Sequence, residues 1–403
     1  MRIVYLLSWA DELWGGVKSV LEGANLLVDR GHQVTVVTQS GPPDWMDLRC
    51  ELLTVPRLNS EAVPEADIVV GTFWPTVPTA VRCGRGVPVH LCQGYEGDNP
   101  ESAPHREQIE AIYALAETHK VTISPHLTNL LRDRFGVEAH EVPYMINTDT
   151  LFAEAERAPS RPVRIGIVGP YDVPGKDIPG ALAACELAHR AGLELQVVRV
   201  STGGPCAGEE PQPFPVEWHT NVPPAQMGQI YRSLDLLVGS CRHRGEGFYL
   251  PAVEAMACGV PCVLTDIPCH RGYGEGQYAL FVPPEDPAAL AEAIVVGSSH
   301  QVARSALREA GLAVAARYRP EAHVDALEAF FASLCASPPA TATANAPAAV
   351  LPAKAPDLSH LNRAMIDALR SVSKAYEDAS RPGEALALRE AAAKLERGPA
   401  PVP

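Results

Sequence analysis

The 403-residue sequence lacks the features of two large classes of protein. No run approaches the roughly 18 to 20 apolar residues that a membrane-spanning helix needs, which argues against an integral membrane protein. The opening apolar stretch is short and is followed at once by Asp11 and Glu12, so it predicts a core strand and not a signal peptide. A basic surface is missing too, because the net charge is −15, and this excludes a nucleic-acid substrate.

We therefore expect a cytoplasmic protein. No basic amphipathic helix is evident, so only weak association with a membrane surface stays open. The abundance of alanine, proline and arginine is typical of a bacterial chain from a GC-rich genome.

The ten cysteines show no metal-binding spacing. A zinc site would need paired CxxC motifs or a similar pattern. The nearest cluster does not supply them: Cys241, His243, Cys258, Cys262, Cys269 and His270. Most of the cysteines lie in apolar runs, so we expect buried free thiols, no metal site and no cofactor.

Strands alternate with amphipathic helices twice along the chain. This pattern predicts an α/β protein with two doubly wound parallel sheets. The first alternation begins at Ile3–Leu7 and the second at Arg164–Val168. Further strands are expected at Gln33–Thr38, Ile68–Val70, Val87–Cys92, Val121–Ser124, His140–Val142, Glu194–Val200, Leu236–Gly239 and Val260–Asp266.

The pattern divides the chain into five segments. We expect one Rossmann-like domain at residues 1–155, a second at 156–318, and a helix at 319–336 with one apolar side. Residues 337–356 are rich in proline and alanine and predict an extended linker. Residues 357–403 predict an α-helical hairpin, which cannot bury its own apolar face. We expect this tail to contact the body, a second subunit or a partner protein.

The segment 245–261, GEGFYLPAVEAMACGVP, carries the clearest chemical signal. Pro251 suits the first turn of a helix, and Gly259 suits the residue just beyond its end, which predicts a helix over Pro251–Cys258. The preceding loop would present backbone amides at the positive end of the helix dipole, an arrangement that binds anions. Glu246 and Glu254 bracket this position. The alternative is an ordinary loop with two exposed glutamates.

The whole segment resembles the E-x7-E signature of the family 4 retaining glycosyltransferases. The resemblance extends over most of residues 1–335. It implies the GT-B fold, in which two Rossmann-like domains face each other across a cleft. In that fold the C-terminal domain binds a nucleotide-diphosphate sugar, here a UDP, GDP or dTDP sugar, and the N-terminal domain binds the acceptor.

The resemblance also implies roles for individual residues. Glu254 is expected to bind the ribose and Glu246 to lie by the donor sugar. Lys176 is expected to bind the diphosphate, which gains charge as it leaves. Gly247 and the amides of Phe248, Tyr249 and Leu250 are expected to contact the sugar or its phosphates.

The sequence departs from the family pattern near the diphosphate. The arginine that often follows the strand glycine is replaced by Pro170 and Tyr171, and Asp177 follows the lysine in place of a glycine. A second cation is therefore expected from other residues, and the candidates are Arg199, Arg242, His243 and Arg244.

In the N-terminal domain Gly15 and Gly16 open the first helix, and family members use this loop near the donor phosphate. Gln93 and Glu96 follow the strand Val87–Cys92 in the pattern Q-x-Y-E, which is similar to a subgroup containing rhamnosyltransferases. We favour Gln93 and Glu96 as catalytic residues over His90, since His90 lies inside an apolar run and suits the core equally well.

The resemblance implies a metal-independent retaining glycosyltransferase in bacterial glycan or glycoconjugate synthesis. Its acceptor would be a glycan, a small molecule or a protein. The alternative is a catalytically silent GT-B scaffold or regulatory subunit. A Rossmann dehydrogenase is not favoured, because the loop SWADELWGGV does not supply GxGxxG after the first strand.

Overall fold

The computed structural model describes residues 1–242 and 246–336 of the chain. Within these ranges two sheets form, and every strand pair in them is parallel. The predicted hairpin and linker, together with His243 and Arg244, lie outside the described residues. The α/β class with two doubly wound sheets is confirmed.

The first sheet contains seven strands in the order β3-β2-β1-β4-β5-β6-β7. Their bounds are β1 (Arg2–Leu7), β2 (Gln33–Thr38), β3 (Glu51–Thr54), β4 (Ile68–Gly71), β5 (Val87–Cys92), β6 (His119–Thr122) and β7 (Ala139–Glu141). The associated helices are α1 (Gly15–Asp29), α2 (Val77–Arg82), α3 (Arg106–Tyr113) and α4 (Pro125–Phe135). We call this sheet with its helices the first unit.

The second sheet contains six strands in the order β10-β9-β8-β11-β12-β13. Their bounds are β8 (Val163–Val168), β9 (Leu195–Ser201), β10 (Val216–Thr220), β11 (Leu236–Gly239), β12 (Cys262–Thr265) and β13 (Leu280–Val282). The associated helices are α5 (Ile178–Arg190), α6 (Pro224–Ser233), α7 (Leu250–Ala257), α8 (Pro268–Arg271), α9 (Pro287–Ser299) and α10 (Gln301–Ala315). We call this the second unit.

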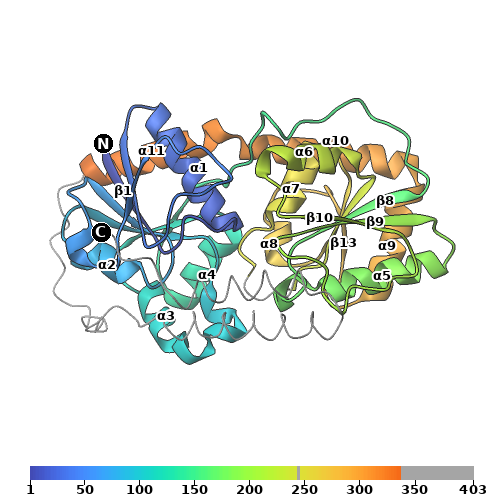
Figure 1. Ribbon diagram of the computed structural model, residues 1–403, viewed down its shortest axis with the longest axis horizontal. Coiled ribbons are helices and arrows are strands. Elements are labelled where there is room, and N and C mark those ends of the chain that lie inside the picture. The colour runs from blue at the N-terminus through green and yellow to red at the C-terminus, as the bar shows by residue number, and fades with distance from the viewer. Residues whose placement is uncertain (243–245, 337–403) are drawn as a thin grey trace.

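Alternate residues of each central strand enter different cores. In β8, Ile165 and Ile167 pack with α5 and α9, while in β9 Val198 and Val200 face the core that contains α6 and α7. Strands buried on both faces are typical of parallel sheets between two layers of helices. In Figure 1 the first unit lies on the left and the second on the right.

The last described helix, α11 (Pro320–Ala336), returns to the first unit. Figure 1 shows it in orange beside α1. Val324, Leu327 and Phe331 are buried in the core of the first unit. No helix in the described part of the chain is long and apolar enough to cross a membrane.

One strand was displaced from its predicted position. The prediction placed a strand at Val121–Ser124, whereas β6 ends at Thr122. The reason is that Ser124 caps α4: its side chain accepts a hydrogen bond from the Leu127 amide, and Pro125 occupies the first turn.

Both sheets reverse their strand order at one point, between β1 and β4 in the first and between β8 and β11 in the second. In open α/β sheets ligands bind outside the carboxyl ends of the strands at such a point. Gly15, Gly16 and Lys176 all follow these strand ends in the chain.

Candidate active site

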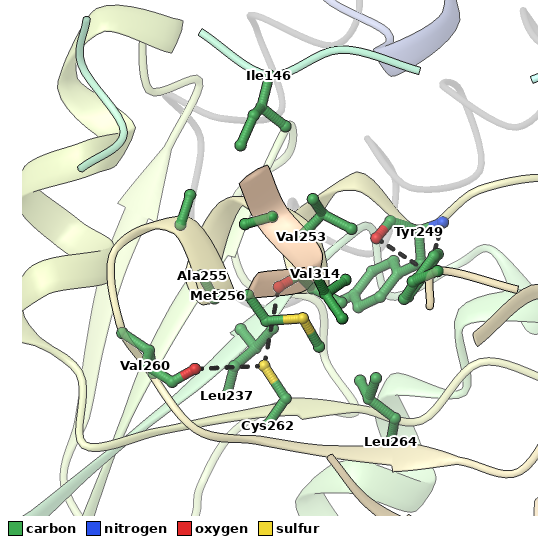
Figure 2. Packing of buried hydrophobic residues seen from close by; sticks show 14 of the residues in the cluster. Ile146, Leu237, Tyr249, Val253, Ala255, Met256, Val260, Cys262, Leu264 and Val314 are labelled. Carbon is green, nitrogen blue, oxygen red and sulfur yellow. Dashed lines mark hydrogen bonds between the residues drawn. The ribbon is translucent and has the colours of Figure 1, made fainter. Parts of the chain in front are cut away.

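Helix α7 is the element around which the candidate site is built, and the core holds it firmly. Val253 and Met256 pack among Leu237, Leu264 and Val314 (Figure 2). All positions of the helix from Ala252 to Ala257 are buried. A helix enclosed in this way fixes the direction of the polar side chain that it carries.

The ends of α7 follow from the sequence. Pro251 lies in the first turn, where its missing N–H costs no helical hydrogen bond. At the other end Gly259 adopts φ 72°, and its N–H donates to the Met256 carbonyl at 2.9 Å. Glycine adopts this left-handed conformation without strain and therefore ends the helix.

Glu254 is the buried carboxylate of α7, with 5% of its surface exposed. Its Oε1 accepts a hydrogen bond from Lys18 Nζ at 2.9 Å, and its Oε2 accepts one from the Tyr231 hydroxyl at 2.8 Å. Lys18 belongs to α1, so this ion pair joins the two units. Burial would lower the pKa of Lys18, but Glu254 and Glu22 outweigh burial and hold that pKa above its ordinary value.

Lys176 and Glu246 form a second ion pair near the start of α7. Lys176 closes the short 3-10 turn Pro174–Lys176, and its Nζ lies 5.0 Å from the ring centroid of Tyr249. Burial would raise the pKa of Glu246, but the Lys176 ammonium holds it below its usual range. Both groups are therefore charged at neutral pH.

The loop before α7 contacts the first unit closely. A Cβ on Gly247 would lie 2.1 Å from the Gln93 carbonyl oxygen, so only glycine allows this approach of two backbones. The Gly247 carbonyl accepts a hydrogen bond from Ser124 Oγ at 3.1 Å. The Phe248 ring stacks on Tyr144 with centroids 4.9 Å apart.

Two of the amides predicted to bind the donor already have acceptors within the protein. The Tyr249 N–H donates to the Tyr273 hydroxyl at 3.1 Å. The Leu250 N–H donates to the Phe248 carbonyl at 3.1 Å. A donor phosphate would have to displace these partners before it could bind to the two amides.

The structure contradicts the assignment of Arg199 as the second cation. Its guanidinium is fully buried, and Nε donates to Glu209 Oε1 at 2.7 Å. Nη1 donates to the carbonyls of Ile167 and Val200. A charge paired in the core in this way cannot reach a ligand without leaving Glu209 unpaired, which would be costly.

Arg242 lies closer to the site but is also engaged. Its Nη2 donates to Asp177 Oδ1 at 2.8 Å, and its Nε lies 3.4 Å from Glu285 Oε1. Asp177 directly follows Lys176 and adopts φ 47°. Arg242 therefore supports the turn that presents Lys176.

Gly15, Gly16 and Gln93 are brought together opposite α7. The Cβ position of Gly15 is 3.5 Å from Leu250 Cδ1, and that of Gly16 is 3.3 Å from Gln93 Nε2. The Tyr144 hydroxyl lies 3.1 Å from Gln93 Oε1. Gly15 thus lies beside the start of α7, and Gln93 lies beside Gly247 in the loop before α7.

Glu96, three residues after Gln93, is hydrogen-bonded within the first unit. Its carboxylate contacts the Tyr113 hydroxyl at 2.5 Å, and burial raises the pKa of Glu96 to about 7. His90 is 1% exposed, and Lys120 Nζ lies 3.4 Å from its Nδ1. Burial, with Lys120 as a further cause, holds the pKa of His90 well below its ordinary value. His90 is therefore a core residue.

Sequence reasoning missed Lys18 and Tyr231, which occupy both oxygens of Glu254. Lys18 stands in the first turns of a surface helix, where a lysine is ordinary, and only a contact 236 positions away distinguishes it. In the described ranges no group of three or more His, Cys, Asp or Glu side chains could hold a metal ion.

Comparisons with known proteins show which family and relatives the chain is similar to. Residues 162–300 match the family model described as glycosyl transferases group 1. The chain is 25% identical over 358 residues to a phosphatidyl-myo-inositol mannosyltransferase of Mycobacterium leprae, which covers 79% of this chain and 93% of that relative.

Two solved structures show the same fold. One is a sucrose-phosphate synthase from Thermosynechococcus elongatus, with a TM-score of 0.68 and 17% identity over 83% of this chain and 98% of that one. The other is the Anabaena protein HepE in complex with UDP and glucose, with a TM-score of 0.66 and 14% identity over 83% of this chain and 100% of that one.

Proposed function

Since the chain is a glycosyltransferase of family 4 with the GT-B fold, we propose that it transfers a sugar from a nucleotide diphosphate with retention of anomeric configuration. The observation that carries the proposal is the convergence of Lys176, Glu246 and Glu254 on α7 and the loop before it. Lys176 follows β8 in the chain, and Lys18, which follows β1, pairs with Glu254.

Each of these residues has a role in donor binding that its chemistry suits. The Glu254 carboxylate accepts hydrogen bonds from the two ribose hydroxyls. Lys176 lies beside the diphosphate, and the N-terminal end of α7 adds the positive end of a helix dipole. Glu246 holds Lys176 in place and faces the donor sugar.

The reaction needs no protein nucleophile and no metal in this proposal. The bond between the anomeric carbon and the β-phosphate oxygen breaks, and the acceptor oxygen forms its bond on the same face of the sugar. The acceptor hydroxyl gives its proton to the departing phosphate oxygen. Lys176 stabilises the charge that develops on this leaving group, and electrostatic stabilisation of this kind is usually the largest single contribution to catalysis.

The donor nucleotide is UDP, GDP or dTDP, and the solved complex of HepE with UDP supports a nucleotide in this fold. The similarity to a phosphatidyl-myo-inositol mannosyltransferase supports a glycan or glycolipid acceptor in bacterial glycan synthesis. Transfer of rhamnose stays a prediction from the Q-x-Y-E pattern.

Incubation of the purified protein with UDP-, GDP- and dTDP-sugars tests the proposal, with release of the nucleotide diphosphate as the readout. We expect turnover of one nucleotide class, and a loss of about 10²–10³-fold in kcat for Lys176→Ala, as for removal of one preorganised donor. Glu254→Ala should weaken donor binding. Arg190→Ala is the matched control, since Arg190 is exposed on α5 and pairs only with Glu186 among the described contacts.

Two results would contradict the proposal. Full activity of Lys176→Ala would remove the proposed stabilisation of the leaving group. Failure of the wild type to bind or hydrolyse any of the three nucleotide classes would favour the silent scaffold. The configuration of the sugar in the product, measured by NMR, tests retention separately.

A further inference from the structure

Lys18, on α1 of the first unit, forms an ion pair with Glu254, on α7 of the second. Its Nζ bonds Glu254 Oε1 at 2.9 Å, and the side chains of the pair are only 12% and 7% exposed. Tyr231 holds the other carboxylate oxygen. Both oxygens of the carboxylate proposed to bind the ribose are thus hydrogen-bonded within the protein.

Lys18 also faces a second carboxylate. Glu22 lies one turn further along α1. Burial raises the pKa of Glu22 and Lys18 offsets part of this rise, while Glu22 helps to raise the pKa of Lys18. One ammonium between two carboxylates carries too little positive charge for both. The cluster of Lys18, Glu22 and Glu254 therefore does not bind an anion in its present arrangement, and Lys18 must change partner to do so.

The cations considered for the diphosphate are each paired with a carboxylate where the structure describes them. Lys176 is paired with Glu246, Arg199 with Glu209, and Arg242 with Asp177 and Glu285. Lysine is suited to a change of partner, because its ammonium sits on a flexible four-carbon arm and donates three hydrogen bonds in any direction. In a nucleotide the ribose carries its first phosphate on the 5′-oxygen, so a lysine beside the ribose hydroxyls lies only a few bonds of the ligand away from that phosphate.

We propose that Lys18 is the second cation of the donor diphosphate: it releases Glu254 to the ribose hydroxyls and moves onto the phosphates. This inference rests on the proposed function. In this proposal both units form the donor site, because α1 adds a positive charge to that of Lys176.

The contact between the units does not depend on the Lys18–Glu254 pair. The Ser124–Gly247 hydrogen bond and the stack of Tyr144 on Phe248 hold the same loop. Lys18 can therefore exchange its partner while the units stay together. A charge-assisted contact with phosphate replaces the one it gives up.

The test compares a nucleoside with its diphosphate by isothermal titration calorimetry. The pairs are uridine with UDP, guanosine with GDP, and thymidine with dTDP, on wild type and Lys18→Met. Removal of a charged hydrogen bond predicts about 10- to 100-fold weaker binding of the diphosphate. Nucleoside affinity should stay the same or rise, since no ammonium competes for Glu254.

Two further variants sharpen the comparison. Lys18→Arg keeps the charge and should retain diphosphate affinity within about threefold, in line with the modest difference expected where bidentate geometry is not required. Arg30→Met is the matched control: Arg30 lies at the end of the same helix and pairs with Asp325 and Glu328 of α11. It should change neither affinity.

The outcomes separate the two proposals. If Lys18→Met weakens nucleoside and diphosphate equally, or changes neither, Lys18 is not the second cation and the inference fails while the proposed function stands. If the wild type binds none of the diphosphates, the proposed function itself fails. Thermal unfolding of each variant, monitored alongside, shows whether a loss of both affinities is a loss of fold.

Discussion

At the scale of single residues, the hydrogen bonds around Tyr113 indicate that the Glu96 carboxyl is protonated. The Tyr113 hydroxyl lies 2.5 Å from Glu96 Oε2 and 2.6 Å from the Gly94 carbonyl. One hydroxyl proton cannot serve two acceptors. If Glu96 is protonated, it donates to Tyr113 and Tyr113 donates to Gly94, so every group is satisfied. This agrees with the pKa of about 7 that burial gives Glu96.

Glu96→Gln therefore changes how stability depends on pH. The folded pKa of about 7 lies above the ordinary value of 4.5, so the folded protein holds a proton that the unfolded chain releases between these values. Stability from this group is present at low pH and is lost as the pH rises to 7. Wild type should lose about 2 to 3 kcal/mol more than Glu96→Gln between pH 5 and pH 8.

Urea unfolding of both proteins at the two pH values measures this difference. Tyr113→Phe is a second probe, because it removes the hydroxyl between Glu96 and Gly94 but leaves the carboxyl buried. Equal pH slopes in wild type and Glu96→Gln would show that Glu96 ionises normally. The result also bears on catalysis, since a protonated Glu96 supports the Gln93–Gly94 turn and does not accept a proton from the acceptor.

At the scale of elements, the strands that the sequence did not reveal share one property. β3, β10 and β13 all lie at the edges of their sheets. Most residues of β3 and β10 are exposed or half-buried. An edge strand buries little apolar surface, so its sequence carries a weak hydrophobic pattern. The central strands, buried on both faces, were predicted within two residues at each end.

The sequence pointed to those candidate site residues that stand close together in the chain. Glu246, Gly247 and Glu254 stand in one short segment whose glycine, proline and glutamate positions follow from a loop and a helix. Arg199 has no such context. Only the fold shows that a loop returns Glu209 to it and buries the pair. The two residues are ten positions apart, but one lies in β9 and the other in the loop after it, so no helix or strand period reveals the pair.

Helix α11 should contribute strongly to the stability of the first unit. Phe331 is 1% exposed in a core formed with α1 and β1. Phe331→Ala leaves a cavity there and should cost about 3 to 5 kcal/mol. Trp9, Trp14, Trp45 and Trp74 lie in the first unit, so tryptophan fluorescence during urea unfolding reports on it.

Ser333→Ala on the exposed side of α11 serves as the control and should stay within about 0.5 kcal/mol of wild type. If Phe331→Ala has an equally small effect, α11 does not belong to the core of the first unit in solution. A large effect would show that α11, the last described helix, stabilises the first unit.

At the scale of the whole molecule, the two units touch through backbone as well as side chains. A Cβ on Gly247 would lie 2.1 Å from the Gln93 carbonyl oxygen and 2.9 Å from Gly94 Cα. Neither backbone atom can turn away as a side chain does. Contact between the units therefore requires glycine at this position, and the site residues of the two units meet only when this contact forms.

Gly247→Ala should hold the units apart while each of them folds normally, because the φ of Gly247 is not in the left-handed region that disfavours alanine. Misplacement of the reacting groups by about 1 Å costs on the order of 10²-fold in rate, so we expect at least that loss in kcat/KM. Small-angle X-ray scattering should give a larger radius of gyration than for wild type. Gly203→Ala is the control, since its added Cβ would meet no atom within 4 Å. An unchanged radius with full turnover in Gly247→Ala would show that the units need not meet in this way for transfer.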